Sequence, residues 1–172
     1  MQPLRGAFVN RRQRGFSLLE LIIVLAIIAI ITMIAIPNVR HIHMQAQETS
    51  ALKSIDTMRT ALQAYEASYG TFPKQQSELG PPNGAAPSKN AADLLDSVMA
   101  PPGGAPAQKD GYVIRYTAGP ADDAGNIVTF TVTADPAAAN VTGVKRYFTD
   151  QNNTIHFTMD GSPATALSPP IH

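Results

Sequence analysis

The segment that decides the fold reads Arg14-Gly15-Phe16-Ser17-Leu18-Leu19-Glu20, and an apolar run continues from it to Ile36. Between Phe16 and Ile36 lie about 21 residues, among which Glu20 is the single charged side chain. As an α-helix this stretch would be roughly 30 Å long, which matches the hydrocarbon thickness of a bilayer. The segment therefore predicts a membrane-spanning helix over residues 16–37.

The glutamate inside this run is the second informative feature. A carboxylate at membrane depth costs a few kcal/mol or more unless it is paired or protonated. A sequence that keeps Glu20 among leucines and isoleucines therefore indicates a functional role for that carboxylate.

The basic leader, the Gly15–Phe16 junction, the position of Glu20 and the uninterrupted apolar run together resemble the N-terminus of type IV pilins and of the pseudopilins of type II secretion. This resemblance implies that a prepilin peptidase cuts after Gly15 and that the new terminal residue, Phe16, becomes N-methylated. It further implies that Glu20 of an incoming subunit meets the Phe16 ammonium of a subunit already in a filament. The expected partners are the peptidase/methyltransferase, copies of the chain and related pilin-like subunits, and an inner-membrane assembly platform.

Two plainer interpretations of the same segment fit less well. A secretory signal peptide has a shorter apolar core followed by a small-x-small cleavage site, whereas this run ends in Ile36-Pro37-Asn38. A plain single-span anchor explains the length and the charge asymmetry, but it requires neither Glu20 nor the Gly15–Phe16 junction.

Charge on the two flanks predicts the orientation. Residues 1–15 contain four arginines and no acidic residue, so the positive-inside rule keeps this leader in the cytoplasm and sends the C-terminal part across the inner membrane. The whole chain is formally neutral, and removing the leader would leave side chains that sum to about −4. No basic patch interleaved with aromatic residues is present, so a nucleic-acid partner is not expected.

The length of 172 residues leaves roughly 100–130 outside the membrane, enough for one small domain. Cysteine is absent, so no disulfide can stabilise that domain.

An amphipathic helix is predicted over residues 38–70, continuous with the membrane-spanning part. Its apolar stripe alternates by three and four residues and ends before Gly70, a natural helix stop. The stripe comprises Leu52, Ile55, Arg59, Leu62, Tyr65 and Tyr69. We expect it to pack on a sheet, and we expect a kink at Pro37, because proline removes one helical hydrogen bond and clashes with the preceding turn.

The remaining chain predicts an α+β fold in which the long kinked helix packs on a small antiparallel sheet of four strands. Residues 71–111 form a Pro/Gly-rich connecting loop with a short helix over Asn90–Met99, residues 112–160 alternate like a β-meander, and residues 161–172 form a loose tail. The residues expected on the inward face of the sheet are Val113, Val128, Phe130, Phe148 and Phe157.

Oxygen ligands in the turns raise the question of calcium, which prefers carboxylate and carbonyl oxygens. The candidates are Asp122, Asp123, Asn126 and Asp150. The family resemblance makes a calcium site conceivable, but Asp and Asn in turns more often serve the backbone. No other cofactor is expected, and because no nucleophile, phosphate loop or zinc spacing is recognisable, neither is an enzymatic role.

Two classes of function remain. The chain is either a structural subunit that polymerises through its N-terminal helix or a membrane-tethered binding module that never polymerises. Within the first class the sequence does not separate a surface pilus from a periplasmic secretion pseudopilus. The segment Ala61–Pro73, which resembles the helix exit of major pseudopilins, and the lack of cysteine favour the pseudopilin.

Overall fold

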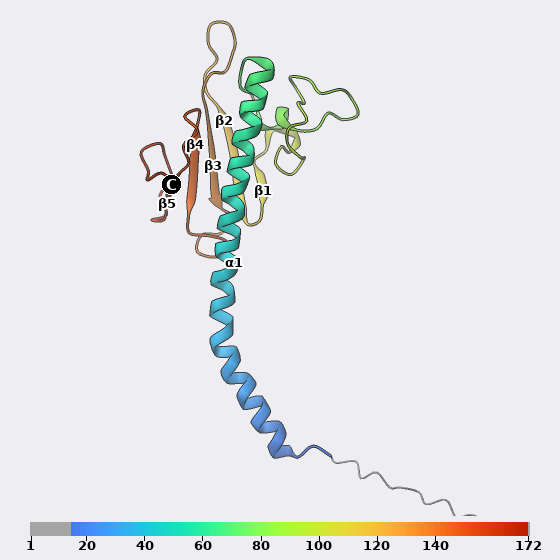
Figure 1. The fold of residues 1–172 in the computed structure, drawn as a ribbon, viewed down its shortest axis with the longest axis vertical. Coiled ribbons are helices and arrows are strands. Elements are labelled where there is room, and N and C mark those ends of the chain that lie inside the picture. The colour runs from blue at the N-terminus through green and yellow to red at the C-terminus, as the bar shows by residue number, and fades with distance from the viewer. Residues whose placement is uncertain (1–14, 172) are drawn as a thin grey trace, which may run out of the picture. The chain divides into compact units, whose positions relative to one another are not determined.

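A computed structural model describes residues 15–171, apart from the side chains of residues 36–38. These residues form two compact units that divide between Arg40 and His41. The predicted leader, except for Gly15, lies outside the described residues. One helix, α1 (Leu18–Tyr69), runs through both units, and the second unit adds five strands and two short 3-10 helices (Figure 1).

The first unit contains the apolar half of α1. Ser17 caps the helix, because its hydroxyl accepts the Leu19 N–H at 3.3 Å and its carbonyl accepts the Leu21 N–H at 3.2 Å. The Thr32 hydroxyl donates to the Ala29 carbonyl at 3.2 Å, so the helix itself satisfies this polar group inside the apolar run. The α1 assignment continues through Pro37. The kink predicted at Pro37 would set how the two units are oriented, and it stays a prediction.

The second half of α1 supplies one wall of the core. Its buried residues recur every three or four positions and include Ala51, Ile55, Met58, Leu62 and Tyr65. Leu52 is half-buried at the margin of the same cluster. Tyr69 is the last helical residue, and Gly70 follows in the left-handed conformation (φ 69°), with its N–H donating to the Glu66 carbonyl at 2.7 Å.

The sheet is an antiparallel meander in the order β1-β2-β3-β4-β5. Its strands are β1 (Ala107–Lys109), β2 (Tyr112–Ala118), β3 (Phe130–Pro136), β4 (Arg146–Asp150) and β5 (His156–Thr158). The second half of α1 lies across it (Figure 1). The α+β class is therefore confirmed, but the predicted number of four strands is wrong.

The extra strand, β1, lies in the segment that was expected to be a loop. It pairs with β2 through Ala107↔Ile114 and Lys109↔Tyr112. Asp110 and Gly111 connect the two strands, both with positive φ (47° and 77°), as a tight two-residue hairpin requires. The Asp-Gly dipeptide is a strong hairpin signal, and it could have identified this strand from the sequence.

The predicted inward face of the first long strand is also wrong. Tyr112, Ile114 and Tyr116 are buried, whereas Val113 is half-buried on the opposite face together with the exposed Arg115. Neighbouring residues of a strand point to opposite faces, so an error of one residue inverts the whole assignment. Arg115 is two residues after Val113 and therefore lies on the same face of the strand. A charged residue belongs on the solvent face, so Arg115 is the sequence signal for the correct assignment.

The other inward candidates give a mixed result. Phe130 is buried and Phe157 packs partly against the core. Val128 precedes β3 and is 56% exposed. Phe148 is on the other face of β4 from the buried Tyr147 and is half-buried. Its ring centroid lies 6.3 Å from that of His156.

The short helix predicted over Asn90–Met99 does not form. The backbone there hydrogen-bonds to a neighbouring segment instead: Ala92 N–H donates to the Glu78 carbonyl at 2.8 Å, and Leu95 N–H donates to that of Leu79 at 2.9 Å. Asp93 takes a left-handed conformation (φ 57°), which interrupts a helix. The segment instead docks on the 3-10 helix η1 (Gln76–Leu79), and a second one, η2 (Pro102–Gly104), precedes β1.

The tail, expected to be loose, lies along β5, with the C-terminal end beside that strand (Figure 1). Phe157 N–H donates to the Pro169 carbonyl at 3.0 Å, and Ile171 N–H donates to that of Ile155 at 2.8 Å. Ile171 also packs against the core. The tail thus covers the outer edge of the sheet, where unpaired backbone groups would otherwise face solvent.

Candidate functional site

The predicted cleavage bond lies outside regular secondary structure, shortly before α1. Gly15 and Phe16 precede the first helical residue, and Phe16 is 82% exposed. A Cβ added at Gly15 would meet no atom within 4 Å, so the fold of the chain gives no steric reason for glycine there. A requirement for glycine at this position must therefore come from a molecule that binds the segment.

Glu20 lies in the first turn of α1 and is exposed within the described structure. It follows Ser17 by three residues, the spacing of a capping box, and the N-terminus of a helix favours negative charge. The carboxylate is therefore suited to compensate positive charge at the start of the helix.

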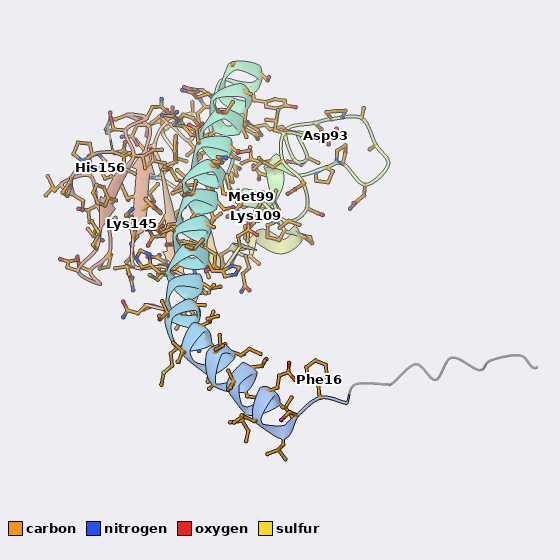
Figure 2. The ribbon with its side chains drawn as sticks, turned by 60° about the horizontal axis from the view of Figure 1, so that its bottom comes forward. Phe16, Asp93, Met99, Lys109, Lys145 and His156 are labelled. Atoms are coloured by element: carbon orange, nitrogen blue, oxygen red, sulfur yellow. The ribbon has the colours of Figure 1, made fainter. Side chains whose placement is uncertain are left out.

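The apolar side chains beyond Glu20 are exposed on all sides of the helix. The large hydrophobic residues between Phe16 and Ile34 are 45–82% exposed, and Figure 2 shows side chains projecting all around the helix that follows Phe16. By length and composition α1 can cross a membrane, and none of its most apolar window is buried in the described structure. A helix that is apolar all round needs lipid or other helices as its surroundings. The motif and this helix together indicate membrane anchoring.

Comparison with known proteins matches the same segment. Residues 10–36 match a family model described as "Prokaryotic N-terminal methylation motif". Over 115 residues the chain is 29% identical to the type II secretion system core protein G of Escherichia coli strain K12. This match covers 67% of this chain and 69% of that protein. Over 72 residues it is 32% identical to the type IV major pilin protein PilE of Neisseria gonorrhoeae, covering 42% and 43% respectively.

The chain thus carries the N-terminal methylation motif and is similar to pilins and pseudopilins. A further relative is the type IV major pilin protein PilA of Myxococcus xanthus, 32% identical over 45% of this chain and 35% of that protein. The matches thus span about two thirds of the secretion protein and less than half of each of these two pilins. No solved structure matches the chain.

The calcium candidates of this pilin-like chain serve their own turns. The Asp122 carboxylate accepts the N–H groups of Ala124 at 3.0 Å and Asn126 at 2.7 Å. Asp150 accepts the backbone N–H of Asn152 at 2.9 Å. Between residues 15 and 171 no group of three or more His, Asp or Glu side chains could hold a metal ion. The calcium site therefore stays a prediction, and calcium enters no step of the proposed function.

A buried carboxylate that the sequence analysis missed anchors α1 to the sheet. Glu48 is 8% exposed, and its Oε1 accepts the N–H groups of Val144 at 2.9 Å and Lys145 at 3.3 Å. The Lys145 ammonium lies 3.3 Å from its Oε2. Burial alone would raise the pKa of Glu48, but the two N–H groups and the ammonium outweigh it and lower that pKa. Glu48 lies one turn before Leu52 of the predicted stripe, a spacing that could have revealed it.

Buried tyrosines fasten the rest of the domain. Tyr65 donates its hydroxyl to the Lys89 carbonyl at 2.6 Å, and Tyr112 donates to that of Lys145 at 2.9 Å. Burial, with neighbouring acidic groups as a smaller cause, raises the pKa of both hydroxyls. Neutral hydroxyls that donate to backbone carbonyls hold loops in place, which is a structural role.

Proposed function

We propose that this chain is a structural subunit of a type IV pilus-like filament, processed by a prepilin peptidase and polymerised through α1. The observation that carries the proposal is the exposed apolar helix preceded by the matched methylation motif. Side chains that find no burial within the chain require a bilayer before assembly and neighbouring helices after it. An enzymatic role is not proposed.

Processing supplies the charge that Glu20 needs. Cutting the Gly15–Phe16 bond creates an ammonium on Phe16, and methylation leaves it positive. In an apolar filament core an unpaired carboxylate is costly, and pairing it with an ammonium relieves both groups. When the pair joins two copies it also fixes their axial register, as a single polar position does in a coiled coil.

The proposed topology follows the flanking charges. The arginine-rich leader stays in the cytoplasm, where the peptidase/methyltransferase acts at the membrane surface, and the domain after Pro37 lies outside the inner membrane. An inner-membrane assembly platform then transfers the subunit into a filament made of this chain and related pilin-like subunits.

The secretion pseudopilus is the favoured form of this filament, and the surface pilus is the second candidate. The match to the secretion core protein G extends over 115 residues and 67% of this chain, whereas the match to PilE covers 72 residues and 42%. The neighbouring genes distinguish the two: secretion-channel genes accompany a pseudopilin, and retraction ATPase genes accompany a pilin.

The substitution Glu20→Ala tests the proposal in the native host. It should leave cleavage and membrane insertion intact but abolish filaments, measured by immunoblot of membrane fractions and by electron microscopy of sheared material. Glu66→Ala is the matched control, because Glu66 is an exposed glutamate on the same helix outside the apolar run. The control strain should assemble normally.

Normal filaments from the Glu20→Ala strain would contradict the assembly role. Glu20 would then only neutralise the positive N-terminus of its own chain. A wild-type chain that is cleaved and inserted but never found in filaments would favour the alternative function, a membrane-tethered binding module.

A further inference from the structure

The turn between β4 and β5 contains the tripeptide Asn152-Asn153-Thr154. This is the N-x-T pattern at which an asparagine side chain can accept an oligosaccharide in proteins exported from the cytoplasm. The inference rests on the proposed topology, which places this turn outside the inner membrane. Neither the filament function nor the turn chemistry discussed above requires a threonine at position 154.

The structure presents the two recognised residues of the tripeptide to solvent. The middle residue, Asn153, is held inward: its carbonyl accepts a hydrogen bond from the Arg59 guanidinium at 2.7 Å, its Oδ1 is buried, and its φ is 61°. The residues on either side, Asn152 and Thr154, are both exposed. No strand includes residues 151–155, so an enzyme can reach this segment without opening the sheet.

A second N-x-T tripeptide, Asn140-Val141-Thr142, has the reverse arrangement. Its middle residue, Val141, is 71% exposed. The Thr142 hydroxyl is turned back onto Ala138, with its oxygen 3.2 Å from both the N–H and the carbonyl oxygen of that residue. The asparagine is exposed, but the threonine hydroxyl that must be recognised is engaged. The same chain therefore provides an internal comparison for the first site.

We propose that Asn152 is an N-glycosylation site and that Asn140 is not. The co-reactant is an oligosaccharide carried on a polyprenyl diphosphate at the outer face of the inner membrane. The Nδ2 atom of Asn152 forms a bond to the anomeric carbon of the first sugar. The bond from that carbon to the diphosphate oxygen breaks, the diphosphate leaves with the electron pair, and a transferase base takes one amide proton.

One local contact defines what the transferase must change. Asn152 Nδ2 donates to Asp150 Oδ2 at 3.2 Å, so this single hydrogen bond must open before the nitrogen can react. The attached glycan would lie beside a groove of about 480 Å³ whose lining includes Lys53, Asp56 and Arg59 of α1 and Asn153 of the turn. It would therefore cover this flank of the domain.

Tryptic peptides of the full chain from its own host test the proposal by mass spectrometry. The two tripeptides fall on different peptides, Tyr116–Lys145 and Tyr147–His172, and the N-terminal peptide Phe16–Arg40 reports processing in the same digest. We expect a glycan mass on Tyr147–His172 alone. Asn152→Gln and Thr154→Ala should abolish it, whereas Thr154→Ser and Asn140→Gln should retain it.

An unmodified Tyr147–His172 peptide from a correctly processed chain would overturn the glycosylation proposal and leave the filament function standing. Modification that survives Thr154→Ala, or that occurs on Asn140 instead, would overturn the geometric argument. A retained leader peptide would count against the proposed function itself, independently of the glycan.

Discussion

Glu48 shows at the scale of one residue how a charge can be accommodated at the edge of an apolar stripe. Its carboxylate accepts two backbone N–H groups from the loop before β4 and faces the Lys145 ammonium, so the charged form is favoured although the residue is buried. The helical spacing of Glu48 was readable in the sequence. Its partners, almost a hundred residues later, were not, because only the folded chain brings that loop to α1.

Glu48 predicts how the stability of the domain depends on pH. A pKa that folding lowers contributes stability above the unfolded value, about 4.3 for glutamate, and this stability is lost as the pH falls through the folded value. In a fragment of residues 41–172, Glu48→Gln should lower the thermal midpoint at pH 7 by about 5 °C. The difference from wild type should shrink as the pH falls below 4.

Thermal melts monitored by circular dichroism between pH 7 and pH 3 check this prediction, with the exposed Glu66→Gln as the control. A difference between Glu48→Gln and wild type that stays constant over this range would mean that the charge of Glu48 contributes no stability.

At the scale of elements, the helix was more predictable than the strands. The stripe through Ile55, Leu62 and Tyr65 repeats over several turns, and a one-residue error in it moves the face by only about 100°. Strand faces alternate with every residue, so an error of one residue assigned Val113 to the inner face in place of the buried Tyr112. The segment around Asp93 was wrong for another reason, since its backbone partners lie on η1 and not within itself.

The packing of α1 on the sheet gives the prediction at this scale. Leu62 is fully buried in the core, so Leu62→Ala should destabilise the 41–172 fragment by about 2–5 kcal/mol in denaturant unfolding. The neighbouring Gln63 is exposed, and Gln63→Ala should change stability by about 0.5 kcal/mol or less. Equal effects of the two substitutions would show that the assigned face of the helix is wrong.

The whole molecule divides into an apolar N-terminal unit and a folded unit that begins at His41. The N-terminal motif is contiguous, so the sequence alone was enough to predict the long apolar helix and the similarity to pilins and pseudopilins. Residues Pro169–Ile171 hydrogen-bond to the chain around β5, which is distant in sequence. No local sequence pattern predicts this pairing, and the tail was therefore expected to be loose. The site residues Gly15, Phe16 and Glu20 stay predictions, because their roles require an enzyme and neighbouring subunits.

The N-terminal peptide of subunits purified from filaments shows whether cleavage after Gly15 precedes assembly. Trypsin should release Phe16–Arg40, because no lysine or arginine lies between these residues, and mass spectrometry should show this peptide with the mass of one added methyl group. This peptide does not contain Asn152, so a glycan on that residue would not change its mass. A peptide from assembled filaments that still carries residues before Phe16 would contradict the claim that cleavage at Gly15 precedes assembly.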